Sequence, residues 1–215
     1  MPQSSGRDTP RAGSDIYGRL PPPEVGPIIT LWRVISGRDV VESADMRKEL
    51  LSTPRFSVEQ REYASPTGKV IKRYVVVHPG AAVILPVLDD RRLVMIRQIR
   101  EVVEQELWEL PAGTLEPGEP PIETATRELE EETGYRAGKI EPLAEFFSTP
   151  GICTEKMHTF LATDLTQVGQ RLEQNERIAV EILETSEVRR MFLAGELIDA
   201  KTIAVLGLYF AQTGE

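Results

Sequence analysis

Four glutamates occupy five consecutive positions, and a helix would bring the carboxylates of three of them together: Glu128, Glu131 and Glu132. They belong to the segment GTLEPGEPPIETATRELEEETGY (113–135), in which a proline pair suits the start of a helix and a glycine suits its end. Crowded carboxylates repel one another unless a cation lies among them. Hard oxygen ligands of this kind suit Mg²⁺ or Mn²⁺. The segment therefore predicts a divalent-cation site.

An apolar stripe on the same helix predicts how the helix packs. Three residues recur at helical spacing and are expected to be buried: Ile122, Ala125 and Leu129. Glu128 and Glu132 border this stripe, whereas Glu123 and Glu130 fall on the other side and are expected to be solvated. A wholly solvated acidic face is the alternative interpretation of such a charge run.

The segment fits the pattern Gly-x5-Glu-x7-Arg-Glu-U-x-Glu-Glu-x-Gly-U, where U is bulky and apolar and Tyr135 replaces the usual aliphatic residue. This pattern resembles the Nudix box, found in enzymes that hydrolyse a nucleoside diphosphate linked to another group. The resemblance implies that Glu128 and Glu132 hold divalent ions and that Glu131 is a third carboxylate. It also implies that the carbonyl of Ala112 is a backbone ligand.

A hydrolytic site also needs groups that orient the carboxylates and accept a proton. Arg127 points about 100° away from Glu128 along the helix, so we expect it to orient a box carboxylate such as Glu119 through a salt bridge. In the enzymes that the box resembles, a glutamate from a late flexible loop activates the water. The matching segment RLEQNERI (171–178) offers Glu176 first and Glu173 second. The remaining candidates for the base are Glu131 and Glu155, and ordinary surface acids are the alternative for the loop.

Features outside the box narrow the substrate class. Pro150 lies sixteen residues after Gly134, in the segment STPG (148–151), with Glu155 just after it. Together with the segments RQIR (97–100), ELPAG (109–113) and GELIDAKTIAVL (195–206), this spacing is similar to that of ADP-ribose pyrophosphatases over roughly residues 55–211. The resemblance implies cleavage of ADP-ribose to AMP and ribose 5-phosphate. Another nucleoside diphosphate derivative, an oxidised nucleoside triphosphate, or a non-catalytic nucleotide sensor on the same fold are the alternatives.

Five residues are candidates for substrate contact. Arg100 is expected, in preference to Arg97, to be the phosphate clamp, because a guanidinium fork matches phosphate oxygens. Arg73 in an expected hairpin is a further candidate. Pro150 and Glu155 belong to the substrate loop that the resemblance implies, although a Thr-Pro-Gly sequence is also an ordinary turn. Phe56 lies where the family has a ring donated by the partner subunit. A homodimer with exchanged N-terminal strands is therefore implied, and a plain core residue is the alternative for Phe56.

Composition limits the class of protein. The 215 residues carry a net charge of −9, which argues against a general nucleic-acid or anionic-membrane binder. Cys153 is the only cysteine, so neither a disulfide framework nor a cysteine-based zinc site is expected. No run of 18 apolar residues suggests a membrane span, and the first fifteen residues lack the apolar core of a signal peptide. We therefore expect a cytoplasmic protein with a small-molecule partner.

The order of predicted elements indicates three regions. Residues 1–27 predict a disordered or draped tail, residues 28–77 an N-terminal β-rich arm that could serve dimerisation, and residues 78–215 the hydrolase domain. Within the arm we expect a strand over 28–36, a short helix over 39–51 and a hairpin over 55–63 and 70–77. A second hairpin is expected over 81–88 and 92–99. Later strands and two C-terminal helices, over 184–194 and 199–211, suggest an α/β/α sandwich around a mixed sheet, which the Nudix resemblance also implies.

Overall fold

The computed structural model describes residues 47–65, 67–174 and 176–214, and its centre is strand β4 (Ala81–Pro86), which is buried along its whole length. Successive side chains of a strand point to opposite faces. Ala82 and Ile84 accordingly join one apolar cluster, whereas Val83 and Leu85 join the other. A strand that is apolar on both faces must be covered on both, and this requirement sets the layers of the fold.

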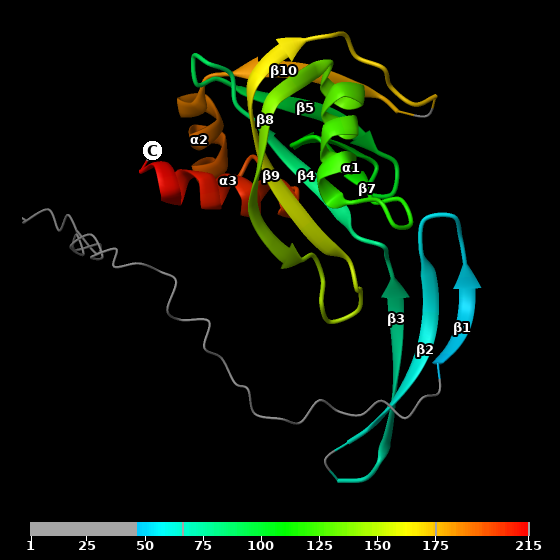
Figure 1. Ribbon diagram of the computed structural model, residues 1–215. Helices are drawn as coiled ribbons and strands as arrows, with labels where there is room; N and C mark the ends of the chain where they lie inside the picture. The colour runs from blue at the N-terminus through cyan, green and yellow to red at the C-terminus, as the bar shows by residue number, and fades with distance from the viewer. Residues whose placement is uncertain (1–46, 66, 175, 215) are drawn as a thin grey trace, which may run out of the picture. The chain divides into compact units, whose positions relative to one another are not determined.

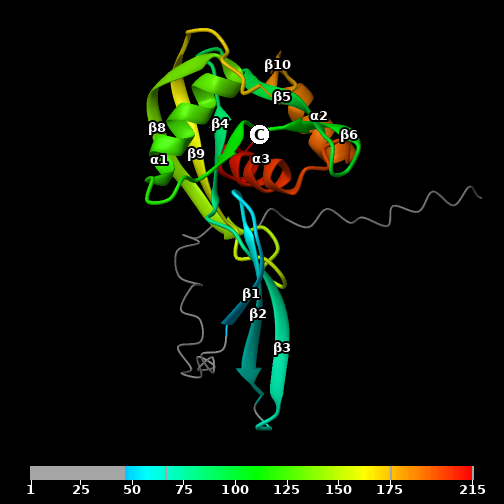
Figure 2. The same ribbon diagram turned by 90° about the vertical axis from the view of Figure 1, so that its right-hand side faces the viewer.

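The helices supply those two covers. Helix α1 (Pro121–Glu128), continued by the π-helical turn η2 (Leu129–Thr133), packs on one face, and α2 (Thr185–Ala194) and α3 (Ala200–Thr213) pack on the other. Figures 1 and 2 show α1 and the pair α2 and α3 on opposite sides of β4. The expected α/β/α sandwich is confirmed, and both C-terminal helices lie where the sequence predicts them. Among the described residues, no helix is long and apolar enough to cross a membrane.

Two sheets form the middle layer. The first is mixed: β4 pairs in parallel with β9 (Lys156–Gln167) and antiparallel with β7 (Ala112–Thr114), and β9 pairs antiparallel with β8 (Tyr135–Phe147). The second is antiparallel, with β5 (Leu93–Arg100) between β10 (Ile178–Leu183) and β6 (Gln105–Glu109). The expected hairpin of β4 with β5 is wrong beyond its turn. Only Val87 and Leu93 bridge, after which β4 pairs with β7 and β9 while β5 enters the second sheet.

The arm is a three-stranded antiparallel sheet of β1 (Arg47–Ser52), β2 (Ser57–Ala64) and β3 (Val70–Val77). The expected hairpin is confirmed as β2 and β3, which pair from Ser57 opposite Val77 to Ala64 opposite Val70. The helix expected over 39–51 is wrong from Arg47 onward, because cross-strand pairing with β2 makes that stretch a strand. The tail at 1–27, the strand at 28–36 and residues 39–46 lie outside the described residues.

The box helix buries Ala125 and Leu129, as its apolar spacing predicts, but not Ile122. Ile122 is 43% exposed, contrary to expectation, whereas Thr124, Ala125, Glu128, Leu129 and Glu132 are buried. The helix therefore buries two carboxylates together with its apolar residues. Glu130 also departs from the sequence prediction, because it is half-buried between two arginines, Arg136 and Arg171.

Gly134 ends the helix and contacts the backbone of the segment after β9. Its φ is 73°, in the left-handed region, and a Cβ built on it would lie 2.6 Å from the backbone nitrogen of Gln170. The amides of Val168 and Gly169 both donate to the Gly134 carbonyl, at 2.7 and 3.1 Å. The glycine thus ends the helix and lets the segment after β9 approach it.

Gly134→Ala is expected to lower the free energy of unfolding by roughly 2–4 kcal/mol, since it adds a backbone clash to the left-handed strain. Gly195→Ala is the matched control, because Gly195 ends α2 at φ 72° with nothing within 4 Å of its Cβ position. The control should lose only about 1 kcal/mol. Denaturant unfolding measures both, and equal losses would contradict the packing role of Gly134.

Candidate active site

The two buried box carboxylates lie at the seam between the helix and β7. A Cβ on Gly113 would fall 1.9 Å from Oε1 of Glu128, so this carboxylate rests directly on the backbone of the strand. Oε2 of Glu132 accepts a hydrogen bond from the amide of Ala112 at 2.8 Å. Glu128 is 9% exposed and Glu132 is 2% exposed. The absence of a side chain at Gly113 is therefore what makes room for the Glu128 carboxylate.

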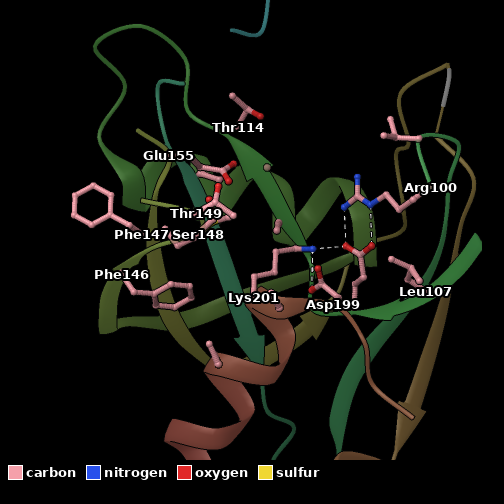
Figure 3. Close-up of a pocket in the computed structure, with 18 of the residues that line it drawn as sticks. Arg100, Leu107, Thr114, Phe146, Phe147, Ser148, Thr149, Glu155, Asp199 and Lys201 are labelled. Carbon is pink, nitrogen blue, oxygen red and sulfur yellow. Dashed lines mark hydrogen bonds and ion pairs between the residues drawn. The ribbon is translucent and has the colours of Figure 1, made fainter. Parts of the chain in front are cut away.

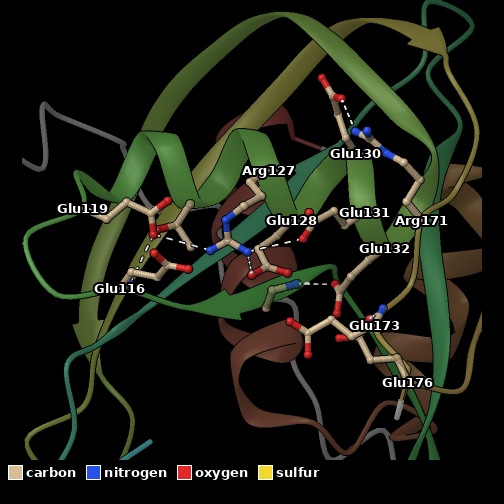
Figure 4. Close-up of polar contacts among 12 residues, drawn as sticks. Glu116, Glu119, Arg127, Glu128, Glu130, Glu131, Glu132, Arg171, Glu173 and Glu176 are labelled. Carbon is tan, nitrogen blue, oxygen red and sulfur yellow. Dashed lines mark hydrogen bonds and ion pairs between the residues drawn. The ribbon is translucent and has the colours of Figure 1, made fainter. Parts of the chain in front are cut away.

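One guanidinium serves three carboxylates at the edge of this seam (Figure 4). Nη1 of Arg127 lies 2.6 Å from Oε1 of Glu128 and 3.4 Å from Oε2 of Glu131, and its Nη2 lies 3.4 Å from Oε2 of Glu119. The expected ion pair of Arg127 with Glu119 is present. The contact with Glu128 is shorter, and the sequence argument, which pointed Arg127 away from Glu128, missed it.

Burial makes the negative charges of Glu132 and Glu128 unfavourable. Desolvation raises the pKa of Glu132 to about 8, even though the Ala112 amide stabilises the charge, and the charges of Glu128 and Glu176 add to the rise. Burial also raises the pKa of Glu128 despite the adjacent Arg127 guanidinium, with contributions from Glu131 and Glu176. Perturbed carboxyls of this kind gather at functional sites.

The donor chemistry of the seam fits a divalent cation. Within the described ranges, no three acidic, histidine or cysteine side chains already converge as a metal-binding group. Glu128 and Glu131 turn toward Arg127, and Glu132 turns toward the Ala112 amide. Even so, the negative charges of these buried carboxylates are unfavourable without a cation. Carboxylate oxygens are the ligands that Mg²⁺ and Mn²⁺ prefer.

The fold brings the late loop to the box. Oε2 of Glu176 accepts a hydrogen bond from the Glu173 amide at 2.9 Å, and the Glu176 amide donates to the Glu173 carbonyl at 3.0 Å. Figure 4 shows both side chains on the Glu132 side of the helix. Glu176 is half-buried and its charge affects the pKa of both Glu128 and Glu132, whereas Glu173 is exposed. The choice of Glu176 before Glu173 as the base stays a prediction.

An open pocket of about 660 Å³ lies beside β7 and reaches Ala112 and Gly113. Its size suits a drug-sized or nucleotide-sized ligand. In Figure 3, Phe146, Phe147 and Glu155 lie on one side of the pocket and Arg100 and Leu107 lie on the other. Two of the expected substrate residues, Arg100 and Glu155, therefore share the pocket that adjoins the box.

A buried glutamate that the sequence analysis missed, Glu109, forms ion pairs with the basic side chains of this pocket. Glu109 is 1% exposed and receives two bonds from Arg100, from Nε at 2.8 Å and from Nη2 at 2.6 Å. Lys201 also contacts Glu109, and its Nζ lies 3.0 Å from Oδ2 of Asp199. Burial acts to raise the pKa of Glu109, but Arg100 and Lys201 outweigh it and lower that pKa. No spacing rule links Glu109 in β6 to Lys201 in α3, so only the fold could identify this group.

The other substrate candidates lie elsewhere. Arg73 and Pro150 line a second pocket of about 430 Å³ between the arm and residues 150–154. Pro150 lies in a turn closed by the Ile152 and Cys153 amides, which both donate to the Thr149 carbonyl. Phe56 is 38% exposed, next to a turn in which its amide donates to Oγ1 of Thr53 at 3.0 Å. Phe56 is thus no core residue, and these three candidates are not among the residues that line the pocket beside the box.

Glu132→Gln is expected to stabilise the metal-free protein at high pH while keeping an acceptor for the Ala112 amide. The folded pKa of Glu132, about 8, lies above the ordinary value of 4.5. The wild type therefore loses stability as the pH rises from about 5 to 9, and the variant lacks the part of this loss that Glu132 causes. We expect a gain of roughly 1–3 kcal/mol at pH 9 that vanishes near pH 4.

Denaturant unfolding in chelator across this pH range measures the difference. Glu123→Gln on the exposed side of the same helix is the control and should follow the wild type. Parallel profiles for wild type and Glu132→Gln would rule out the inferred destabilising charge.

Comparisons with known proteins agree with this geometry. The model of the NUDIX domain matches residues 77–206. The chain is 36% identical to the ADP-ribose pyrophosphatase of Bacillus subtilis over 167 residues, covering 77% of this chain and 90% of that protein. It is 35% identical to the ADP-ribose pyrophosphatase of Mycobacterium tuberculosis, covering 74% and 79%.

A solved structure described as an ADP compounds hydrolase shares the fold, with a TM-score of 0.66, 22% identity and coverage of 79% of this chain and 94% of that one. The resemblance drawn from the box is confirmed. Together with the Glu128 carboxylate that lies against Gly113, these matches show that the chain belongs to the NUDIX family.

Proposed function

We propose that the protein hydrolyses the diphosphate linkage of ADP-ribose, or of a closely related nucleoside diphosphate sugar, to AMP and ribose 5-phosphate. The observation that carries the proposal is a pair of buried carboxylates with raised pKa values, Glu128 against Gly113 and Glu132 on the Ala112 amide, beside a nucleotide-sized pocket. The substrate follows from the relatives, two of which are ADP-ribose pyrophosphatases at 35–36% identity.

Mg²⁺, or Mn²⁺ in its place, is the proposed cofactor. Glu128, Glu131, Glu132 and the carbonyl of Ala112 would hold it, and the ion would neutralise phosphate charge as the anhydride bond breaks. Arg127 shares its guanidinium among the box acids and so keeps Glu128 and Glu131 oriented. A carboxylate oxygen of Glu176 would take the proton of the attacking water, with Glu173 as the second candidate.

Residues of the pocket would contact the substrate. Arg100 would contact phosphate through guanidinium N–H groups that its two bonds to Glu109 leave over, and Glu155 borders the opposite wall. Arg73, Phe56 and Pro150 would reach substrate only from a second subunit. We also propose a cytoplasmic location, since a single cysteine is typical of a reducing compartment.

Another member of the sugar class is the main competing substrate. The chain is 29% identical to a GDP-mannose pyrophosphatase of Escherichia coli over 75% of its length. Oxidised nucleoside triphosphates are a second alternative, and a substrate panel assayed for nucleotide and phosphate release separates the three. A non-catalytic nucleotide sensor would bind nucleotide without turnover, so metal-dependent turnover distinguishes it from an enzyme.

ADP-ribose turnover is expected to require a divalent cation, because buried carboxylates otherwise repel the diphosphate. Product identification with Mg²⁺ should give AMP and ribose 5-phosphate, with no activity in excess chelator. Glu132→Gln should lower kcat by about 10³-fold or more, and Glu123→Gln should not. Triphosphate hydrolysis with an equal or higher kcat/KM would overturn the substrate assignment.

Glu176→Gln is expected to lower kcat by about 10²- to 10⁴-fold with little change in KM, as the loss of a general base does. Glu173→Gln should be milder, because Glu173 is exposed and contributes its amide to Glu176. Steady-state kinetics decide between the two. Normal kcat in both variants would move the base to Glu155 or Glu131.

The arm is proposed to pair with a second copy of the chain. Leu50 and Leu51 are exposed on β1 and Val70 and Tyr74 on β3, and a small sheet needs a packed hydrophobic face to be stable. We therefore expect a homodimer. Light scattering at working concentration measures the mass, and a monomer would refute both the pairing and the cross-subunit roles of Arg73, Phe56 and Pro150.

A further inference from the structure

The segment after β9 is fixed to the end of the box helix by its first residues. The amide of Arg171 donates to the Glu131 carbonyl at 3.0 Å, next to the two bonds that reach the Gly134 carbonyl. The last carbonyls of a helix lack partners within the helix. Here the segment that leads to Glu173 and Glu176 supplies those partners. The helix that carries the box acids and the loop that carries the proposed base therefore meet at one junction.

The side chain of Gln170 bridges the two ends of this connection. Its Nε2 donates to the backbone carbonyl of Glu132 at 2.7 Å and approaches the carbonyl of Ile178 at 3.5 Å. Glu132 is a box residue and Ile178 is the first residue of β10, where the loop ends. One amide group thus connects the backbone behind a box carboxylate to the start of the next strand.

Glu130 makes the side-chain contact between helix and loop. Its Oε2 lies 3.1 Å from Nη2 of Arg171 (Figure 4). Its Oε1 lies 2.6 Å from Nε of Arg136. Arg136 belongs to β8, so its pair with Glu130 does not involve the loop. The same carboxylate therefore makes one contact that joins the helix to the loop segment, with Arg171, and one that does not, with Arg136.

The junction is what connects the loop of Glu173 and Glu176 to the box helix. It supplies the backbone and side-chain bonds that join this loop to the box helix. The described bonds of residues 173 and 176 are made with each other. These two residues therefore do not by themselves anchor the loop to the box helix. Arg171 also places a positive charge at the helix C-terminus, where the helix dipole favours it.

We propose that Gln170, Arg171 and Glu130 are positioning residues that hold Glu176 over the box. The inference rests on the proposed role of Glu176 in hydrolysis. None of the three residues needs to touch substrate. Their loss should therefore lower kcat and leave KM nearly unchanged, because placement of the reacting groups, not substrate affinity, is disturbed.

The experiment compares five single variants, and the double variant of Glu130→Gln with Arg171→Gln, with the wild type by hydrogen–deuterium exchange of residues 168–178 and by ADP-ribose kinetics with Mg²⁺. Gln170→Leu removes the amide donor, and Gln170→Lys keeps a donor. Arg171→Gln and Glu130→Gln break the loop contact. Arg136→Gln is the matched control, because it removes the other partner of Glu130.

Gln170→Leu is expected to speed exchange in 168–178 and lower kcat by roughly 10- to 100-fold, and Gln170→Lys should recover part of both. Arg171→Gln and Glu130→Gln should lower kcat by about two- to five-fold, the scale of an exposed ion pair, and the double variant should lose no more than either single one. Arg136→Gln should match the wild type in both measurements.

Wild-type exchange in Gln170→Leu and Arg171→Gln would overturn the anchoring, and faster exchange with unchanged kcat would overturn the positioning role. A larger effect of Arg136→Gln than of Arg171→Gln would also overturn the proposal, since it would make Glu130 a local structural residue. Exchange does not depend on turnover, so it decides the anchoring even if ADP-ribose is not hydrolysed. A low kcat for Glu176→Gln beside a normal one for Gln170→Leu would leave the proposed function intact and refute only the inference.

Discussion

The contact of the Glu128 carboxylate with the bare backbone at Gly113 is the constraint on which the site depends. It fixes the rotation of the box helix on the sheet. In that rotation Glu132 reaches the Ala112 amide, and the apolar Ile122 is turned outward. Burying two carboxylates instead of an isoleucine costs stability, which natural proteins accept at functional sites.

Two buried glutamates illustrate how environment separates structural from functional acids. Glu109 and Glu132 are both almost fully covered. Arg100 and Lys201 contact Glu109 and lower its pKa, whereas Glu132 has a single amide partner and acidic neighbours, and its pKa rises. The first is satisfied by the protein itself and organises one wall of the pocket. The second retains a demand for positive charge that a divalent cation can meet.

Connections distant in sequence give this site its geometry. Gly134 allows the segment after β9 to approach the helix end, and β7 presents Gly113 and Ala112 from the opposite side. Both approaches join backbone to backbone or carboxylate to backbone, so they are less adjustable than side-chain contacts. The arm, in contrast, is mostly exposed and leaves Arg73 and Phe56 outside the pocket beside the box.

The sequence by itself determined the box helix, its glycine end, most strands, both terminal helices and the family, because these depend on local periodicity and fixed spacing. Tertiary structure alone decided the rest. The turn after β4 looked like a hairpin, but pairing with β9 and β7 took that strand into another sheet. Arg47–Ser52 became a strand through pairing with β2. Glu109 met Lys201, and Glu130 met Arg171, only because the fold brings residues far apart in the chain together. Such long-range contacts have no local signal in one sequence.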